Sequence, residues 1–126
     1  GCGYHGQLGL GIQKNVHSPQ RINTFDAGYI KQVSAGLYYS VFICDNHVYT
    51  TGGCDTPDIY LSDVYGYISK ELGHGDRFTD GLTVPEKIPD FHCPVKDVSS
   101  NGSTYFLLEN NNVYMLAKNN FHLLNK

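Results

Sequence analysis

Residues 30–52 read IKQVSAGLYYSVFICDNHVYTTG, and residues 95–117 read VKDVSSNGSTYFLLENNNVYMLA. Placed over each other without gaps, at an offset of 65 residues, the two stretches share a Val-Ser pair, an Asn and a Val-Tyr pair, and apolar positions stay apolar. The similarity extends upstream: Pro19, Ile22 and Phe25 match Pro85, Ile88 and Phe91 at an offset of 66, and Leu8, Gly9 and Gly11 match Leu72, Gly73 and Gly75 at an offset of 64. Ordered matches at a nearly fixed period are the signature of a tandem repeat.

Each copy of the repeat has the pattern of antiparallel β-structure. Apolar and aromatic runs at residues 39–44 and 47–51 flank Asp45-Asn46, a pair suited to a tight hairpin turn. The same hairpin is expected at residues 104–109 and 112–116 around Asn110-Asn111. A further strand is expected before each hairpin, at residues 29–33 and 95–99, and no segment shows sustained helical periodicity. The expected fold class is all-β, with each repeat forming one blade of a β-propeller.

The repeat also predicts how the chain is divided. Its 126 residues leave room for one ordinary domain and no second large core. We expect a first unit at residues 1–52 and a second at residues 53–117, which is longer because of an insertion at about residues 54–69. Residues 118–126 are expected to start a third unit.

Composition excludes several classes of protein. Hydrophobic residues make up 40% of the chain and charged residues 17%, which is a globular composition. A net charge of −3 gives no basic field for nucleic acid, and no apolar run is long enough to span a bilayer. The four cysteines have no Cys-x-x-Cys spacing, so we expect mostly free thiols in a reducing, intracellular compartment, with Cys44 as a small buried apolar residue.

The first unit carries a recognisable motif. Residues 3–11 read GYHGQLGLG, and they are followed by Pro19, by VSAG at 33–36 and by VYTTG at 48–52. This pattern resembles one full repeat of the regulator-of-chromosome-condensation (RCC1) family, loosely repeated in the second unit. The resemblance implies two blades and the start of a third from a seven-bladed propeller, with the other blades in the same chain or in other chains. A kelch propeller is the alternative, because a double glycine at 52–53 follows a strand, but the pattern occurs once and the chain has no tryptophan.

The insertion is the candidate contact site. It interleaves acidic and aromatic residues with aliphatic ones, and loops on rigid scaffolds commonly carry binding. The residues expected to contact a partner are Asp58, Tyr60, Asp63, Tyr65 and Tyr67. The alternative is that the insertion has no function, since long surface loops cost little stability.

Signals for catalysis, cofactors and metals are weak. Residues 1–6 read GCGYHG, a literal G-x-G-x-x-G. A dinucleotide site needs a helix directly after this motif, but the residues that follow are poor helix formers. The six histidines do not pair with one another or with cysteine at metal-ligand spacing, and His74 is expected in a loop. We therefore predict no catalytic residue, no cofactor and no metal.

Two functions follow from these observations. The first is a non-enzymatic scaffold that presents its loops to another protein, with no nucleic acid or membrane as partner. The second is implied by the resemblance alone: guanine-nucleotide exchange on a Ran-like small GTPase, in which a wedge projecting from one blade contacts the GTPase.

Overall fold

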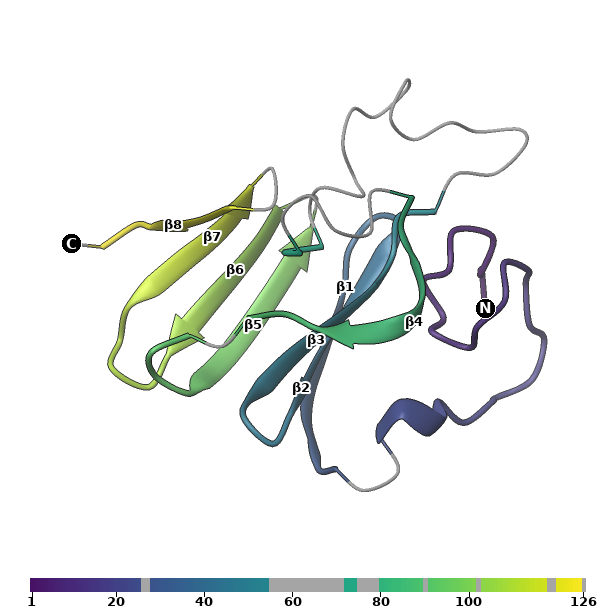
Figure 1. Cartoon of the computed structure of the whole chain (residues 1–126), viewed down its shortest axis with the longest axis horizontal. Helices are drawn as coiled ribbons and strands as arrows, with labels where there is room; N and C mark the ends of the chain where they lie inside the picture. Colours follow the sequence, from purple (N-terminus) through teal and green to yellow (C-terminus); the bar gives the residue numbers. More distant parts are fainter. Residues whose placement is uncertain are drawn as a thin grey trace.

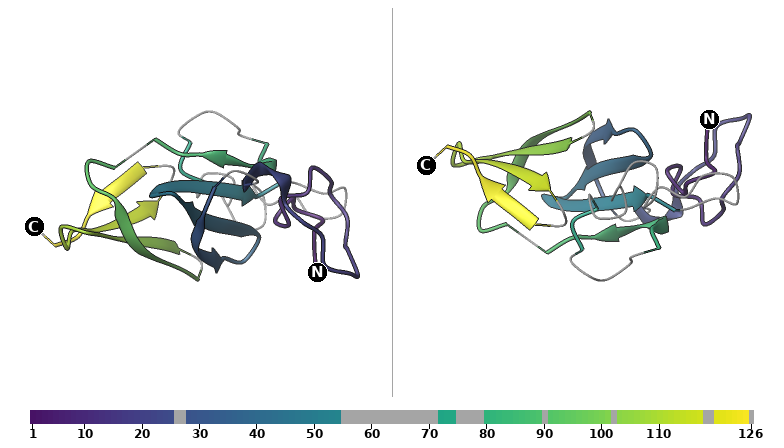
Figure 2. Two further views of the ribbon diagram at one scale, coloured as in Figure 1. Left: turned by 90° about the horizontal axis from the view of Figure 1, so that it is seen from below. Right: turned by 90° about the horizontal axis from the view of Figure 1, so that it is seen from above.

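The computed structural model describes residues 1–25, 28–54, 72–74, 80–89, 91–101, 103–117 and 120–125. Within them, two four-stranded antiparallel sheets lie side by side, with the N-terminal segment at one end of the molecule and the C-terminus at the other (Figures 1 and 2). The one helix among these residues is a 3-10 turn, η1, at Asn23–Phe25. The expected all-β class is confirmed.

The first sheet has the strand order β1-β2-β3-β4 and the second the order β5-β6-β7-β8. The first sheet contains β1 Ile30–Ala35, β2 Tyr39–Cys44, β3 His47–Gly52 and β4 Leu82–Lys87. The second sheet contains β5 Val95–Asn101, β6 Ser103–Leu108, β7 Val113–Ala117 and β8 Asn120–Leu123. We call these sheets blade 1 and blade 2.

The first predicted hairpin is confirmed. Cys44 pairs with His47 across a two-residue turn in which Asp45 and Asn46 have φ angles of 50° and 72°. This left-handed pair matches the right-handed twist of the flanking strands, and Asp and Asn tolerate the conformation.

The second hairpin forms at the expected place but with a different turn. Three residues, 109–111, separate Leu108 from Asn112, whose carbonyl accepts a hydrogen bond from the Leu108 amide. Asn111 takes the left-handed conformation, with φ 67°. The connection between β5 and β6 is one residue shorter than the connection between β1 and β2. Three residues separate the paired Ser100 and Thr104, whereas four residues separate the corresponding pair, Ala35 and Ser40.

These two changes correct the gapless alignment of the repeats. Phe42 pairs with Val33 and Tyr49 in blade 1, and Phe106 pairs with Val98 and Tyr114 in blade 2. Strands β2 and β6 therefore correspond at an offset of 64, whereas their neighbours correspond at 65. An offset of 65 across this strand is wrong by one residue, and a one-residue slip exchanges the two faces of a strand.

The hydrophobic core lies between the blades. Tyr39, Val41 and Ile43 of β2 face Phe106 and Leu108 of β6, and all five are at most 1% exposed. Strand β5 packs against β1 and β2, and the side chains of Lys31 and Gln32 donate hydrogen bonds to the carbonyls of Val95 and Val98. Each blade thus buries its apolar residues mainly against its neighbour, as repeat units do.

The segment before each blade supplies an aromatic cover. Phe25 packs its ring at 5.0 Å from Phe42 and 5.1 Å from Tyr49. Phe91 lies 5.3 Å from both Phe106 and Tyr114 and 5.0 Å from Phe121. The match of Phe25 with Phe91 in the sequence corresponds to this shared role.

The outer strands β4 and β8 lie beyond the three strands expected per repeat. Strand β4 contains Pro85, which is compatible with an edge strand. It pairs with β3 across a long connection, at residues 53–81, so that blade 1 takes its fourth strand from the second sequence unit. The division at residues 1–52, 53–117 and 118–126 stays a prediction about repeats; the sheets span residues 30–87 and 95–123.

Candidate functional site

The predicted contact residues lie in the insertion. Asp58, Tyr60, Asp63, Tyr65 and Tyr67 fall within residues 55–71, outside the residues that the structure describes. The structure does describe both flanks of this segment, Gly52–Cys54 on one side and Leu72–His74 on the other. We call these two flanks the root of the insertion.

The N-terminal flank of the root is fixed to the glycine-rich loop of the first unit. The backbone amide of Cys54 donates to the carbonyl of His5 at 3.0 Å. The ring of His5 returns a bond of 2.7 Å from Nδ1 to the carbonyl of Cys54, so Nδ1 carries the hydrogen. His5 is 3% exposed, and its ring meets that of Tyr38 edge-on at 4.4 Å.

The C-terminal flank is fixed to strand β3. The hydroxyl of Thr50 donates to the carbonyl of Leu72 at 2.7 Å. Nε2 of His74 lies 3.0 Å from the same hydroxyl oxygen. Because the hydroxyl hydrogen is committed to Leu72, Nε2 is the donor in this second bond. Thr50, Leu72 and His74 are all buried.

The next residue of β3 connects the root to the rest of the blade. The hydroxyl of Thr51 lies 2.9 Å from the carbonyl oxygen of Gly6 and 3.0 Å from that of Leu82. A Cβ at Gly6, where φ is 78°, would lie 2.4 Å from the Leu82 oxygen, so only glycine fits there. The specific GQLG motif therefore packs closely against the first blade's β3 and β4.

The root is thus a rigid base. Its buried polar groups are matched with partners, and an unpaired group at such a place would cost stability. The N-terminal flank is held by His5 of the glycine-rich loop, and the C-terminal flank is held by Thr50 of β3. Sequence reasoning missed the roles of His5 and Thr50. His74 lies outside the strands, as expected, but its hydrogen bond with Thr50 was not predicted. The adjacent threonines at the end of an apolar strand are the available signal.

The described residues contain no group of three or more His, Cys, Asp or Glu side chains that could hold a metal ion. Residues 1–6, the G-x-G-x-x-G match, form turns rather than the start of a helix. All four cysteines are thiols: Cys2 is exposed, Cys93 half-buried, and Cys44 and Cys54 buried, which confirms the prediction for Cys44.

A second notable surface is the face of blade 2 that points away from blade 1. Tyr105 and Leu107 occupy the positions of Val41 and Ile43 in blade 1. Val41 and Ile43 are fully buried against the neighbouring blade, whereas Tyr105 is 42% exposed and Leu107 half-exposed. A shallow groove of about 110 Å³ runs over this face.

None of the helices in the described part of the chain meets the length and apolarity that a membrane crossing requires.

The model of the regulator of chromosome condensation (RCC1) repeat matches residues 1–43. The chain carries an RCC1 repeat. Among curated proteins, the inhibitor of Bruton tyrosine kinase from Xenopus laevis is 30% identical over 122 residues, covering 93% of this chain. The RCC1-repeat chain spans 8% of that relative's length.

Solved structures agree on the fold. Prp20p from Saccharomyces cerevisiae, described with its binding properties to Gsp1p and histones, aligns with a TM-score of 0.56 at 16% identity over 91% of this chain and 27% of its own. Yeast RCC1 (Prp20) bound to Kap60 aligns with a TM-score of 0.54, also at 16% identity, over 91% of this chain and 26% of its own. The two sheets of the RCC1-repeat chain are therefore blades of an RCC1-type propeller.

Proposed function

We propose that this chain is part of a protein-interaction scaffold and that the insertion after β3 is its contact surface. The proposal rests on the buried hydrogen bonds that fix the root of the insertion. A loop held at both ends by buried hydrogen bonds, through Thr50 on one side and His5 on the other, loses less freedom when a partner binds. The five insertion residues predicted from the sequence supply the contacts: three tyrosines as amphipathic anchors and two aspartates as acceptors for basic or polar groups.

We propose further that the two blades belong to a larger ring, with seven blades as the resemblance implies. The exposed face of Tyr105 and Leu107 supports this, since the equivalent face of blade 1 is buried against a following blade. The other blades come from the same chain or from other chains. The thiols support an intracellular location.

The test uses the full-length protein that carries this chain. Replacing Tyr60, Tyr65 and Tyr67 together with alanine is expected to weaken partner binding at least about tenfold, as loss of anchor residues does. The matched control replaces Tyr4 and Tyr29, which are 51% and 73% exposed and lie outside the insertion. Gsp1p, histones and Kap60 are the first partners to try, because RCC1-type relatives were studied with them. Equal binding by both variants and the parent would remove the insertion as the contact site.

The second candidate function is guanine-nucleotide exchange on a Ran-like small GTPase. It is supported by the fold shared with Prp20p, whose binding to Gsp1p has been described. The experiment measures release of labelled GDP from a panel of small GTPases with and without the full-length protein. If the protein accelerates GDP release and the double variant Asp58→Asn, Asp63→Asn does not, the result would support exchange through the insertion. Absence of acceleration across the panel would leave the scaffold function alone.

A further inference from the structure

A groove with basic and aliphatic side chains opens in the loop that follows the glycine-rich motif. It measures about 520 Å³ and is lined by residues between positions 10 and 21. Three of its lining side chains are aliphatic and half-buried: Leu10, Ile12 and Val16. The other lining residues are polar and exposed: Lys14, Asn15, His17, Gln20 and Arg21. No acidic residue lines this groove in the part of the chain that the structure describes.

The charge around the groove is opposite to that of the whole chain. The chain has a net charge of −3, but residues 1–25 contain Lys14 and Arg21 and neither aspartate nor glutamate. The corresponding stretch of the second unit, residues 66–91, contains five acidic residues and three basic ones. The positive charge is therefore particular to the first unit and is not a property that the two repeats share. Such a local excess attracts negatively charged ligands.

The position of the basic side chains in the repeat keeps them accessible. At the offset of 66 residues, Gln20 and Arg21 correspond to Glu86 and Lys87 of β4. Both of these counterparts are exposed, although β4 is paired with β3. Strand pairing at this place in a blade thus leaves the side chains at these two positions on the surface.

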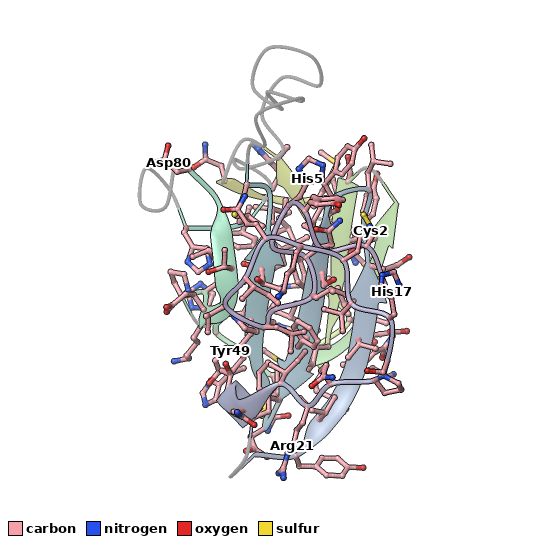
Figure 3. The ribbon with its side chains drawn as sticks, turned by 90° about the vertical axis from the view of Figure 1, so that its right-hand side faces the viewer. Cys2, His5, His17, Arg21, Tyr49 and Asp80 are labelled. Atoms are coloured by element: carbon pink, nitrogen blue, oxygen red, sulfur yellow. The ribbon has the colours of Figure 1, made fainter. Side chains whose placement is uncertain are left out.

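The groove is separate from the root of the insertion. In Figure 3, His5, which holds the N-terminal flank of the root, lies toward one end of the strands. Arg21 lies toward the other end, with His17 between them. A ligand in the groove therefore occupies a different surface from the one proposed above for the insertion.

We propose that this groove binds an extended acidic peptide segment of a partner protein, one in which carboxylate and aliphatic side chains alternate. The carboxylates pair with Lys14 and Arg21, and the side-chain amides of Asn15 and Gln20 hydrogen-bond the peptide backbone. Successive side chains of an extended peptide point to opposite sides, so the aliphatic set faces Ile12 and its aliphatic neighbours in the groove. Nucleic acid would satisfy the two cations but has no aliphatic side chains to cover the apolar part of the lining.

The test measures binding of a fluorescently labelled peptide to the full-length protein that carries this chain. The probe is a short peptide in which glutamate and valine alternate. One control peptide has glutamine for glutamate, and a second has serine for valine. We expect both controls to bind at least about tenfold more weakly than the probe, because each loses one of the two kinds of contact. Rising salt is expected to weaken binding of the probe.

Variants of the protein locate the site. The double substitution Lys14→Gln, Arg21→Gln is expected to weaken probe binding at least about tenfold, whereas Arg21→Lys keeps the charge and stays within a few-fold of the parent. The matched control is Lys87→Gln, which removes a cation from the position that corresponds to Arg21 in the second unit. We expect it to bind the probe as the parent does. The Tyr60, Tyr65 and Tyr67 to alanine variant is expected to do the same, so this result does not depend on the proposed role of the insertion.

Four results would overturn the proposal. The first is absence of saturable binding of the probe to the parent protein. The second is equal binding of the serine control, since charge alone would then explain the attraction. The third is an equal loss of affinity in Lys87→Gln or in the insertion variant, because the probe would then bind elsewhere. The fourth is tighter binding of an oligothymidylate of the same length, which would make nucleic acid the occupant.

Discussion

The hydroxyl oxygens of Tyr39 and Thr104 lie 2.7 Å apart and join blade 1 to blade 2 within the buried core. Tyr39 is 1% exposed and Thr104 is fully buried. The hydroxyl of Ser100 lies 3.3 Å from that of Thr104 and gives it a second partner. This small polar network sits where the two blades must keep a fixed position relative to each other.

Removing the Tyr39 hydroxyl is expected to destabilise the contact between the blades modestly. The substitution Tyr39→Phe keeps the ring and leaves Thr104 bonded to Ser100, so we expect a loss of about 1 kcal/mol in the free energy of unfolding. Urea denaturation measures it. The control is Tyr105→Phe, on the exposed face of blade 2, for which we expect no measurable change. Equal effects of the two substitutions would contradict an energetic role for the bridge.

Phe91 is expected to contribute more to stability than its repeat counterpart Phe25. Phe91 contacts three aromatic rings between the blades, whereas Phe25 covers two on the outer face of blade 1. We expect Phe91→Ala to cost about 3 kcal/mol, because it opens a cavity in the core. Phe25→Ala is expected to cost clearly less. Thermal and urea unfolding of both variants, with Phe91→Leu as the conservative control, would decide the order.

Thr50 is expected to hold the insertion's root. Thr50→Val has nearly the same shape but leaves the Leu72 carbonyl and His74 Nε2 without this hydroxyl, so we expect a loss of about 2 kcal/mol. Thr50→Ser restores the hydroxyl and most of the stability. Hydrogen exchange is expected to rise first at residues 72–74. If exchange rises equally throughout β5 and β6, Thr50 acts on the whole core instead of the root.

The exposed Cys2 and the buried Cys44 are expected to react with alkylating reagents at different rates. Burial, and secondarily the negative charge of Asp45, raises the pKa of the Cys44 thiol above its ordinary value of 9.0. The folded protein therefore holds Cys44 neutral, and exposed Cys2 is expected to react first with iodoacetamide at pH 8. Mass spectrometry of a time course measures the order. Faster labelling of Cys44 than of Cys2 would show that blade 1 opens readily.

The same shift gives a pH dependence of stability. The unfolded chain ionises Cys44 at lower pH than the folded chain does, so its stabilising contribution is complete below the ordinary thiol pKa and is lost as pH rises through the folded value. Asp45→Asn is expected to move this loss to slightly lower pH, because only the smaller cause of the shift is removed. Denaturation between pH 7 and 10 tests the direction, with Cys44→Ala as the variant in which this contribution is absent.

Much of each blade followed from local patterns. The apolar run at residues 39–44 and the Asp45-Asn46 pair specify a hairpin without help from distant residues, because alternation and turn chemistry act over a few positions. The outer strands did not follow in the same way. Strand β4 contains Pro85, and its partner lies beyond a long connection, so only the assembled sheet identifies it.

The sequence by itself determined the all-β class and both hairpins, since each depends on residues close together in the chain, and comparison of its two halves indicated the duplication. Tertiary structure alone decided the rest. The offset of 64 between β2 and β6 arises from a shorter loop and a longer turn that cancel in the sequence, so no gap reveals which face of β6 is buried. The root likewise joins His5 to Cys54 and Thr50 to His74 across tens of residues. Contacts of that kind form only when packing brings the strands together, because no local propensity encodes them.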